Sequence, residues 1–511
     1  MFMLKKIIPS ELNKIPYIPP GWAYGKLEHL IYIAGRIGWR GLKADEYTQD
    51  GPLLLSVYNL NKGDYVDFND VYHISQERYD ESPEIMLREN DILLTKDGAG
   101  IGKIGIVKNL PGPATVNSSL LVIRASGIFV PEFLFYLLKG PRMQDIVRAR
   151  ITGSATPHLF QRDIKQFTLL IPPLAEQRRI VAKIEELFTQ LEAGTAALRR
   201  VQAGLKRYKA SVLKAACEGR LVDQAPSDEP AVKILKRISV EKGDEALPTL
   251  IGNFPELPKG WVWARLEQIS LLDVGYAFKS EEFALQGIRL LRGDNIEPGS
   301  LRWTNTRYWP EEKLNNFRHL LVKEGDIILA MDRPLISSGL KIARASNRDL
   351  PSLLVQRVAR FNPIIPQMAD YLFIALQTQS FINHLTKKQT GTQLPHISAK
   401  DILSFVIPLP PITEQYRIVA EVERRLSVVA KVEAAVEAGL KRAARLRQTV
   451  FKRAFEGRLV AQDPEDEPAE SLLERIKQVH PRMEHEHAHG VTGRAVKQKR
   501  KGRKPGQLDL F

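Results

Sequence analysis

The sequence contains almost no cysteine and no long apolar run. Cys217 is the single cysteine among 511 residues, which excludes an intramolecular disulfide and a cysteine-based metal cluster and fits a reducing compartment. No stretch approaches the ~18 uninterrupted apolar residues of a membrane-spanning helix. The N-terminal MFMLKKII reaches Pro9, Ser10 and Glu11 before a hydrophobic signal region forms, so we expect no signal peptide. We therefore expect a cytoplasmic protein with no membrane partner.

Motifs for catalysis are also missing. Residues 100–105 match GxGxxG, but they lead into Pro111 with no helix to receive a pyrophosphate, so we interpret them as a hairpin turn. Asp97 stands where a Walker A loop requires its first glycine, so no such loop is present. The (Asp/Asn)-Pro-Pro-(Tyr/Phe) motif of amino-methyltransferases is also absent. No nucleophile and base pair stands out, so we expect a binding protein without catalytic residues, metal or cofactor of its own. Four C-terminal histidines lack a second ligand cluster: His480, His485, His487 and His489.

The chain carries a strong positive charge. Its 74 Lys and Arg residues exceed its 59 Asp and Glu residues, which gives a formal net charge of +15. The last 31 residues hold 8 Lys/Arg and 3 Asp/Glu, so they supply only +5 of it. A body that stays basic without its tail is what binding to a phosphate backbone requires, although many basic proteins bind no nucleic acid. The charge therefore favours an anionic partner.

One segment occurs twice. PPLAEQRRIVAKIE at 172–185 returns as PPITEQYRIVAEVE at 410–423, with nine of fourteen positions identical at an offset of 238 residues. Each copy opens a run in which apolar residues recur every seven positions, which is typical of a coiled coil. Gly219 and Gly457 close the two runs, because glycine is the expected helix stop. The residues expected to pair the helices are Ile184, Leu191, Leu198, Leu205 and Val212 in the first run and Val422, Val429, Val436, Ala443 and Val450 in the second.

The duplication extends beyond these helices. TGSATPHL at 152–159 matches TGTQLPHI at 390–397. Between such landmarks the halves diverge, and both indicate α+β units of short strands, glycine-rich turns and a helix near 131–147 or 368–385. Similar frames with different interiors indicate one scaffold that presents two different surfaces. We expect globular units at 1–171 and 257–409, long helices at 172–222 and 410–460, a short helix with a linker at 223–256, and a short helix with a basic, disordered tail at 461–511.

Together these features resemble the DNA specificity subunit of type I restriction-modification enzymes. The resemblance covers nearly the whole chain to about residue 480, and it rests on the doubled IPPLAEQ and IPLPPITEQ signatures with EGRLV at 218–222 and 456–460. It implies an α+β fold in which two target recognition domains are joined by two long antiparallel coiled-coil helices, related by a pseudo-two-fold internal repeat. It also implies a subunit that is not an enzyme by itself.

The resemblance further implies a set of partners. Each recognition domain would read one half of a bipartite site in double-stranded DNA, and the helices would set the spacer and dock two modification subunits. Those subunits would carry S-adenosylmethionine for N6-adenine methylation, and restriction (motor-nuclease) subunits using ATP and Mg²⁺ would join them. A rigid helix pair would hold two readers at a fixed separation, as dimer spacing does in other DNA-binding proteins.

The sequence does not single out base-reading residues, because direct readout depends on three or four side chains in a groove. For each candidate, the alternative to base reading is a solvated surface charge or a contact with a phosphate. The candidates are Lys96, Lys103, Arg150, His158 and Arg162 in the first unit and Arg333, Lys341, Arg357, Lys387, Gln389 and His396 in the second.

The C-terminal tail raises a separate hypothesis. Residues 494–504 hold seven basic residues in eleven, which predicts disorder and nonspecific phosphate contact. The chain then ends Gln507-Leu508-Asp509-Leu510-Phe511, similar to peptides that dock bacterial DNA-processing proteins on the sliding clamp. An apolar tail that docks on the protein's own surface is the competing interpretation. Titration of the last fifteen residues against purified clamp, with and without Leu510→Ala and Phe511→Ala, distinguishes the two.

Two alternative functions stay open at this point. A nucleotide-dependent oxidoreductase using residues 100–105 would bind a cofactor in calorimetry. A coiled-coil scaffold with protein-binding globular units would retain no specific DNA sequence after co-expression with the products of adjacent genes.

Overall fold

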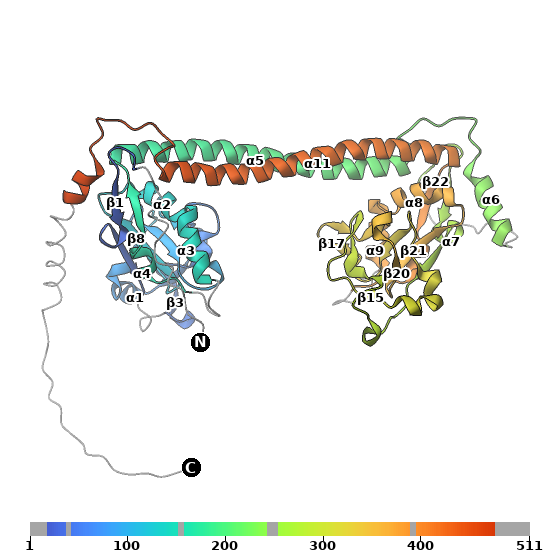
Figure 1. Cartoon of the computed structure of the whole chain (residues 1–511), viewed down its shortest axis with the longest axis horizontal. Coiled ribbons are helices and arrows are strands. Elements are labelled where there is room, and N and C mark those ends of the chain that lie inside the picture. Colours follow the sequence, from blue (N-terminus) through green and yellow to red (C-terminus); the bar gives the residue numbers. More distant parts are fainter. Residues whose placement is uncertain (1–17, 37–41, 152–157, 243–253, 389–394, 476–511) are drawn as a thin grey trace, which may run out of the picture. The chain divides into compact units, whose positions relative to one another are not determined.

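The computed structural model describes residues 18–36, 42–151, 158–242, 254–388 and 395–475. The chain forms two compact units that are not contiguous in sequence. Unit 1 takes its residues from Met1–Ala196 and Leu440–Phe511, and unit 2 from Ala197–Gly439. Each unit contains one globular body, one end of the first long helix and the opposite end of the second (Figure 1).

A four-stranded antiparallel sheet forms the centre of unit 1, in the order β2–β8–β5–β6. Its strand β5 (Ile92–Thr95) is buried along its whole length. Because side chains alternate along a strand, Ile92 and Leu94 enter a core shared with the long helices, whereas Leu93 enters a second core against the three-stranded sheet β4–β3–β7. The other strands are β2 (Ile31–Gly35), β3 (Tyr47–Leu55), β4 (Tyr72–Ile74), β6 (Ile104–Ile106), β7 (Ala114–Val116) and β8 (Leu120–Ala125).

Short helices and one strand pair complete this body. The single helix predicted near 131–147 is in fact two, α2 (Pro131–Lys139) and α3 (Pro141–Ile151), because Gly140 caps α2 and Pro141, which has no N–H, begins α3. The predicted hairpin turn is confirmed, since residues 96–103 link the antiparallel strands β5 and β6, although Ile104 and Gly105 already belong to β6. The remaining elements are α1 (Gln76–Asp80), α4 (Gln161–Lys165) and the antiparallel pair β1 (Ala23–Lys26) with β9 (Thr168–Ile171).

Unit 2 repeats this topology with different residues. Its central antiparallel sheet has the order β11–β21–β16–β19, its second sheet the order β15–β12–β20, and β10 pairs with β22. Both second sheets contain one parallel pair, β3 with β7 and β12 with β20. The strands are β10 (Val262–Arg265), β11 (Ser270–Val274), β12 (Ile288–Leu291), β15 (Tyr308–Trp309), β16 (Ile327–Ala330), β19 (Ile342–Arg344), β20 (Ser352–Leu354), β21 (Val358–Pro363) and β22 (Val406–Leu409).

The helices and hairpins of unit 2 include one further correction. The helix predicted near 368–385 is again two, α8 and α9. The helices are α6 (Ala231–Lys242), α7 (Leu266–Ile269), α8 (Ala369–Ala375), α9 (Gln379–Lys388) and α10 (Ala399–Leu403), and the hairpins are β13 (Ile296–Glu297) with β14 (Ser300–Leu301) and β17 (Leu335–Ile336) with β18 (Gly339–Leu340).

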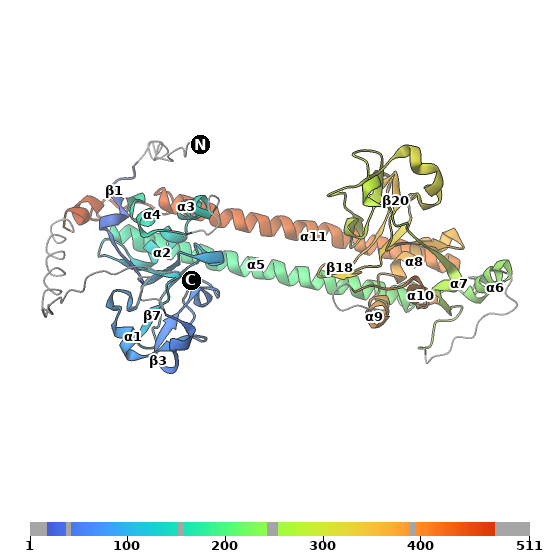
Figure 2. The ribbon, with the colours of Figure 1, turned by 90° about the horizontal axis from the view of Figure 1, so that it is seen from below.

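The two long helices are α5 (Leu174–Cys217) and α11 (Ile412–Phe455), each of 44 residues. In unit 1 the rings of Phe188 and Phe451 pack edge to face with centroids 5.1 Å apart. In unit 2 Lys209 Nζ lies 3.2 Å from Glu433 Oε2. Early residues of α5 thus meet late residues of α11, and late residues of α5 meet earlier ones, so the helices are antiparallel, as their course in Figure 1 and Figure 2 shows.

The predicted pairing positions differ in burial. Ile184, Val212, Val422, Val429, Val436 and Val450 are buried, whereas Leu191, Leu198, Leu205 and Ala443 are half-buried. Val201 and Tyr208, which continue the apolar pattern of α5, are each 44% exposed. The helix pair therefore leaves some of its apolar side chains uncovered within this chain.

Beyond each long helix the chain returns to the body of the same unit. We call residues 456–475 in unit 1 and 218–242 in unit 2 the return segments. In unit 1, the indole of Trp22 donates to Glu176 Oε2 at 2.8 Å, and Gln462 of the return segment donates to Glu176 Oε1 at 3.4 Å. The same contacts recur in unit 2 among Trp261, Glu414 and Gln224 at 3.0 and 3.4 Å.

A glycine at the start of each return segment makes this contact possible. Gly457 has φ +67°, and a Cβ there would lie 2.4 Å from Pro19 Cγ; Gly219 has φ +66°, and its Cβ would lie 2.3 Å from Pro258 Cγ. Only glycine fits such a left-handed turn at close approach. An ion pair then fixes each segment, Arg179 to Asp466 at 2.6 Å and Arg417 to Asp228 at 2.5 Å.

The buried side chains of Glu176 and Glu414 should make the stability of the folded state depend on pH in a characteristic way. Burial raises the pKa of Glu176 and of Glu414. A raised pKa in the folded state contributes stability below the unfolded value of about 4.3, and this contribution is lost as pH rises through the folded pKa. We therefore expect a Glu176→Gln/Glu414→Gln variant to gain Tm relative to the wild type as pH rises from about 4 to 7, measured by differential scanning calorimetry.

Asp228→Asn provides a control of opposite sign. The hydrogen bond from Arg417 lowers the pKa of Asp228, so its contribution is present above the unfolded value and is lost as pH falls through the folded pKa. The deficit of Asp228→Asn should be largest at neutral pH and shrink in acid. Parallel pH profiles for all three proteins would contradict this account.

Candidate nucleic-acid interface

In unit 1, three segments meet where the chain leaves β5. The backbone N–H of Lys96 donates to Ser119 at 2.9 Å, and the N–H of Leu159 donates to the carbonyl of Lys96 at 2.9 Å. Asp97 and His158 form an isolated antiparallel bridge. The candidate residues Lys96 and His158 are thereby held next to each other.

The carboxylate of Asp97 links the two candidate side chains. Its Oδ1 accepts a hydrogen bond from His158 Nδ1, and its Oδ2 lies 3.9 Å from Lys96 Nζ. An ionised carboxylate only accepts, so Nδ1 must carry the hydrogen in this bond. Nε2 of His158 is then the ring nitrogen that does not take part in this hydrogen bond.

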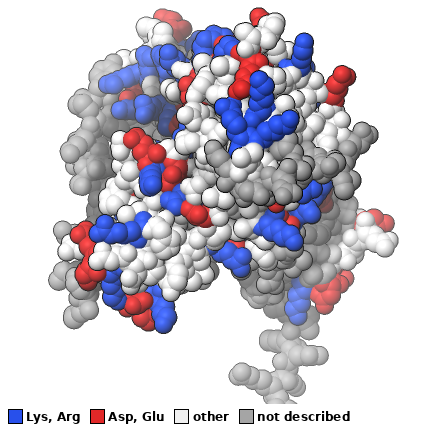
Figure 3. Space-filling view, turned by 90° about the vertical axis from the view of Figure 1, so that its right-hand side faces the viewer, with Lys and Arg blue, Asp and Glu red and all other residues white. Residues whose placement is uncertain are grey.

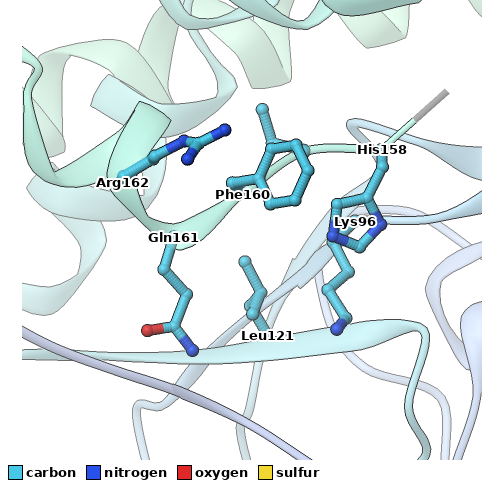
Figure 4. Close-up of a pocket in the computed structure, with 7 residues that line it drawn as sticks. Lys96, Leu121, His158, Phe160, Gln161 and Arg162 are labelled. Carbon is cyan, nitrogen blue, oxygen red and sulfur yellow. The ribbon is translucent and has the colours of Figure 1, made fainter. Parts of the chain in front are cut away.

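A shallow pocket opens beside this pair. It has a volume of about 350 Å³ and is lined by Lys96, Leu121, His158, Leu159, Phe160, Gln161 and Arg162. Phe160 is 42% exposed, with the His158 ring 4.4 Å from its centroid and the Arg162 guanidinium 4.5 Å above it. Figure 4 shows Lys96 and His158 on one side of Phe160 and Arg162 on the other. Three sequence candidates thus share one pocket.

Unit 2 forms the same junction with other side chains. The N–H of Met331 donates to the carbonyl of Arg357 at 2.9 Å, and that of Ile397 donates to Met331 at 3.0 Å. Asp332 and His396 form an isolated antiparallel bridge, as Asp97 and His158 do in unit 1. The candidates Arg357 and His396 therefore lie at one junction.

Two arginines at this junction have unusual backbone conformations. Arg333 has φ +43° and Arg357 has φ +64°, which are uncommon values for a side chain other than Gly, Asn or Asp. The N–H of Arg333 donates to Pro395 at 2.7 Å, and Arg357 Nε lies 3.9 Å from Asp332 Oδ1. Both side chains are exposed. The surrounding contacts thus hold two exposed arginines in strained backbone conformations, and the guanidinium of Arg357 lies beside the Asp332 carboxylate.

The other candidates lie in different surroundings. Lys341 is only 8% exposed, and burial lowers its pKa while Asp294 and Asp332 oppose that change. Lys103 donates to Asn61 Oδ1 at 2.5 Å, and Lys387 is exposed in the last turn of α9. Arg150 lies in α3. Gln389, the tail residues Gln507, Leu508, Leu510 and Phe511, and the histidines at 480–489 lie outside the described residues.

Sequence reasoning missed the aspartates of these junctions. Asp97 ends the stretch DILLTKD at 91–97, and Asp332 ends DIILAMD at 326–332. Both stretches share the spacing D-I-x-L-x-x-D, and each places its last aspartate two residues beyond a buried strand. A comparison of the halves at an offset of 235 residues, instead of 238, would have found the pair.

The charged side chains on one face of the molecule lie in small groups. In the view of Figure 3, Lys and Arg side chains lie among Asp and Glu side chains and do not form a field of one sign. Local clusters such as the two junctions are therefore the plausible contacts for an anionic ligand.

Other kinds of site find little support in the described ranges. Among residues 18–475 outside the gaps, no group of three or more His, Cys, Asp and Glu is arranged to hold a metal ion, and no helix is both long and apolar enough to cross a membrane. Burial raises the pKa of the Cys217 thiol to about 12, which is the opposite of the activation that a nucleophilic thiol needs. A structural role for Cys217 fits this shift in its pKa.

Comparison with known proteins shows to which family the chain belongs. The family model described as the type I restriction modification DNA specificity domain matches residues 48–198 and again residues 258–435. The two matches follow the internal repeat and together cover more than half of the chain. The chain belongs to the family of type I restriction-modification specificity subunits, which are non-catalytic.

Individual relatives agree with this assignment. The EcoAI specificity subunit of Escherichia coli is 32% identical over 366 residues, which are 60% of this chain and 62% of that protein. The EcoKI specificity subunit of Escherichia coli K12 is 23% identical over 476 residues, 90% of this chain and 96% of that protein. The chain thus matches less than two thirds of the EcoAI subunit and nearly all of the EcoKI subunit.

The fold is also found in a solved structure. One chain from a study of assembly and conformational transition in the type I restriction-modification system has a TM-score of 0.58 at 20% identity, with 87% of this chain and 100% of that chain covered. The likeness shows that the two chains share a fold.

Proposed function

We propose that this chain gives a type I restriction-modification complex its DNA sequence specificity, with each unit reading one half of a bipartite double-stranded site. The supporting observation is that one frame recurs with different side chains at the same junction. Where unit 1 has Phe160 and Gln161, unit 2 has Ser398 and Ala399. A repeated frame can be positioned on DNA in the same way while different side chains contact different bases.

The long helices support the proposed spacer and docking roles. A continuous helix of 44 residues is about 66 Å long at 1.5 Å per residue. Several apolar side chains on the helix pair are exposed, and such side chains are often buried in an interface with a partner. They are Val201, Tyr208, Tyr416, Val428, Val432 and Leu446. We assign this surface to two modification subunits, which bring S-adenosylmethionine. Restriction subunits would add ATP and Mg²⁺, and the sliding clamp stays a hypothesis from the tail sequence.

Methylome sequencing tests the proposal. The chain is co-expressed with the modification subunits of the same organism, and the modified adenines are mapped. We expect one bipartite motif with an unread spacer. A chimaera in which another family member supplies residues 18–171 should change one half-site and keep the other. A change in both half-sites, or no sequence-specific modification, would refute the proposal and favour the scaffold alternative.

A further inference from the structure

We propose that the Asp–His pair of each unit, Asp97 with His158 and Asp332 with His396, is a phosphate clamp that holds the DNA backbone. The clamp makes the same sequence-independent contact in both half-sites. This inference rests on the proposed function, that each unit contacts DNA, and adds which residues bind the backbone and which are left to read bases.

The first argument is the recurrence of the pair between diverged halves. Each aspartate lies two residues beyond the matching central strand, β5 or β16, and each histidine bridges to it from the segment before α4 or α10. The neighbouring positions Phe160 and Gln161 differ between the units, being Ser398 and Ala399 in unit 2. A side chain that reads a base must change when the half-site changes, whereas a phosphate contact positions the protein and carries no sequence information. The unchanged pair therefore fits the backbone.

The second argument is the chemistry of the unit 1 pocket. Asp97 engages Nδ1 of His158, so Nε2 is the nitrogen that can donate to a ligand once it is protonated. Lys96 and Arg162 line the same pocket. With His158 protonated, three positive groups then face one carboxylate, and a monoanion such as a phosphodiester balances much of the excess. Charge-assisted hydrogen bonds from such groups are the strong ones.

The third argument concerns the guanidinium groups of unit 2. Arg333 and Arg357 are exposed beside Asp332, and both occupy left-handed backbone conformations. Such strain persists where the structure needs a side chain in one place. The planar fork of arginine suits phosphate oxygens in two-point contacts. Unit 2 thus presents two exposed arginines at the junction where unit 1 presents Lys96 and Arg162.

Two measurements on the complex with modification subunits test the clamp. The first is the salt dependence of binding to random-sequence duplex, in which loss of one phosphate contact lowers the slope of log K against log salt by about 0.9. We expect this change for His158→Ala and for His396→Ala, with affinity about tenfold lower on random and specific DNA alike. The second is ethylation interference on the mapped site, where each variant should lose interference at one phosphate of one half-site.

Matched variants separate a specific effect from unfolding. His73→Ala removes another half-buried histidine of unit 1, which lies in β4 with its Nδ1 2.8 Å from the Gly51 carbonyl oxygen, and should change neither slope nor interference. Lys96→Gln repeats the test without touching the histidine. Thermal melting of each variant must match that of the wild type, and a variant that melts early is replaced by His158→Gln or His396→Gln for the same two measurements.

The outcomes distinguish this inference from the function on which it rests. An altered methylated motif in His158→Ala would make the histidine a base reader and overturn the clamp. So would unchanged slope and interference. If the wild type binds random DNA but methylates no defined sequence, the proposed function fails, while the slopes still decide the clamp.

Discussion

Deleting one heptad from each long helix, Leu191–Ala197 and Val429–Ala435, is expected to shorten the unread spacer of the methylated site by about 3 base pairs. Seven helical residues span about 10.5 Å, and each base pair of B-DNA rises 3.4 Å. Because whole heptads are removed, the apolar positions of both helices stay in phase. The deletion also removes the partner of Lys209, Glu433, but this exposed ion pair is worth at most about 1 kcal/mol.

A deletion in one helix alone is the control for this experiment. Removing Leu191–Ala197 while α11 stays intact leaves seven residues of α11 with no residues of α5 to pack against. We expect that protein to be destabilised and to give weak or no methylation, not a shorter spacer. Methylome sequencing of the double deletion checks the prediction, and an active complex with an unchanged spacer would refute the spacer role of the helices.

Local patterns in the sequence were sufficient for the long helices and the repeat. The seven-residue spacing, the proline pairs before Leu174 and Ile412 and the glycines after Cys217 and Phe455 are all signals within a few residues of the feature they predict. The same kind of signal is present in the sequences of β5 and β16. Each is a short apolar run bounded by turn residues, and each proved to be a buried central strand.

Contacts between distant segments could not be predicted in this way. Lys96 and His158 were separate candidates, and only the fold shows that Asp97 joins them. Lys341 was a candidate by its charge, yet it is buried beside the edge strand β19. Arg124 in β8 pairs with the buried Asp91 at 2.5 Å, as Arg360 in β21 pairs with Asp326 at 3.3 Å. Such pairings depend on strand order, which no local spacing encodes.

The packing of the return segments was not predicted from the sequence. The C-terminal return segment completes the N-terminal body. Asp466 pairs with Arg179, and the N–H of Ala469 donates to Gly21 at 2.9 Å. Ala469 and Leu472 are buried in the same core as Trp22. Residues close to the two ends of the described chain therefore fold as one body, and the equivalent segment at 218–242 does the same for unit 2.

Ending the chain after Phe455 is therefore expected to unfold unit 1 while unit 2 stays folded. Loss of a buried leucine side chain such as Leu472 alone costs about 2–5 kcal/mol. Glu176 also loses its hydrogen bond from Gln462, and Arg179 loses its ion pair with Asp466. The sum is comparable with the 5–15 kcal/mol of stability that a whole domain has. Calorimetry should show loss of one transition, and hydrogen exchange should assign it to residues 18–190. Truncation after Arg475 keeps the return segment and is the control. If both truncations melt alike, or if unit 2 unfolds with unit 1, the return segment does not hold the N-terminal body.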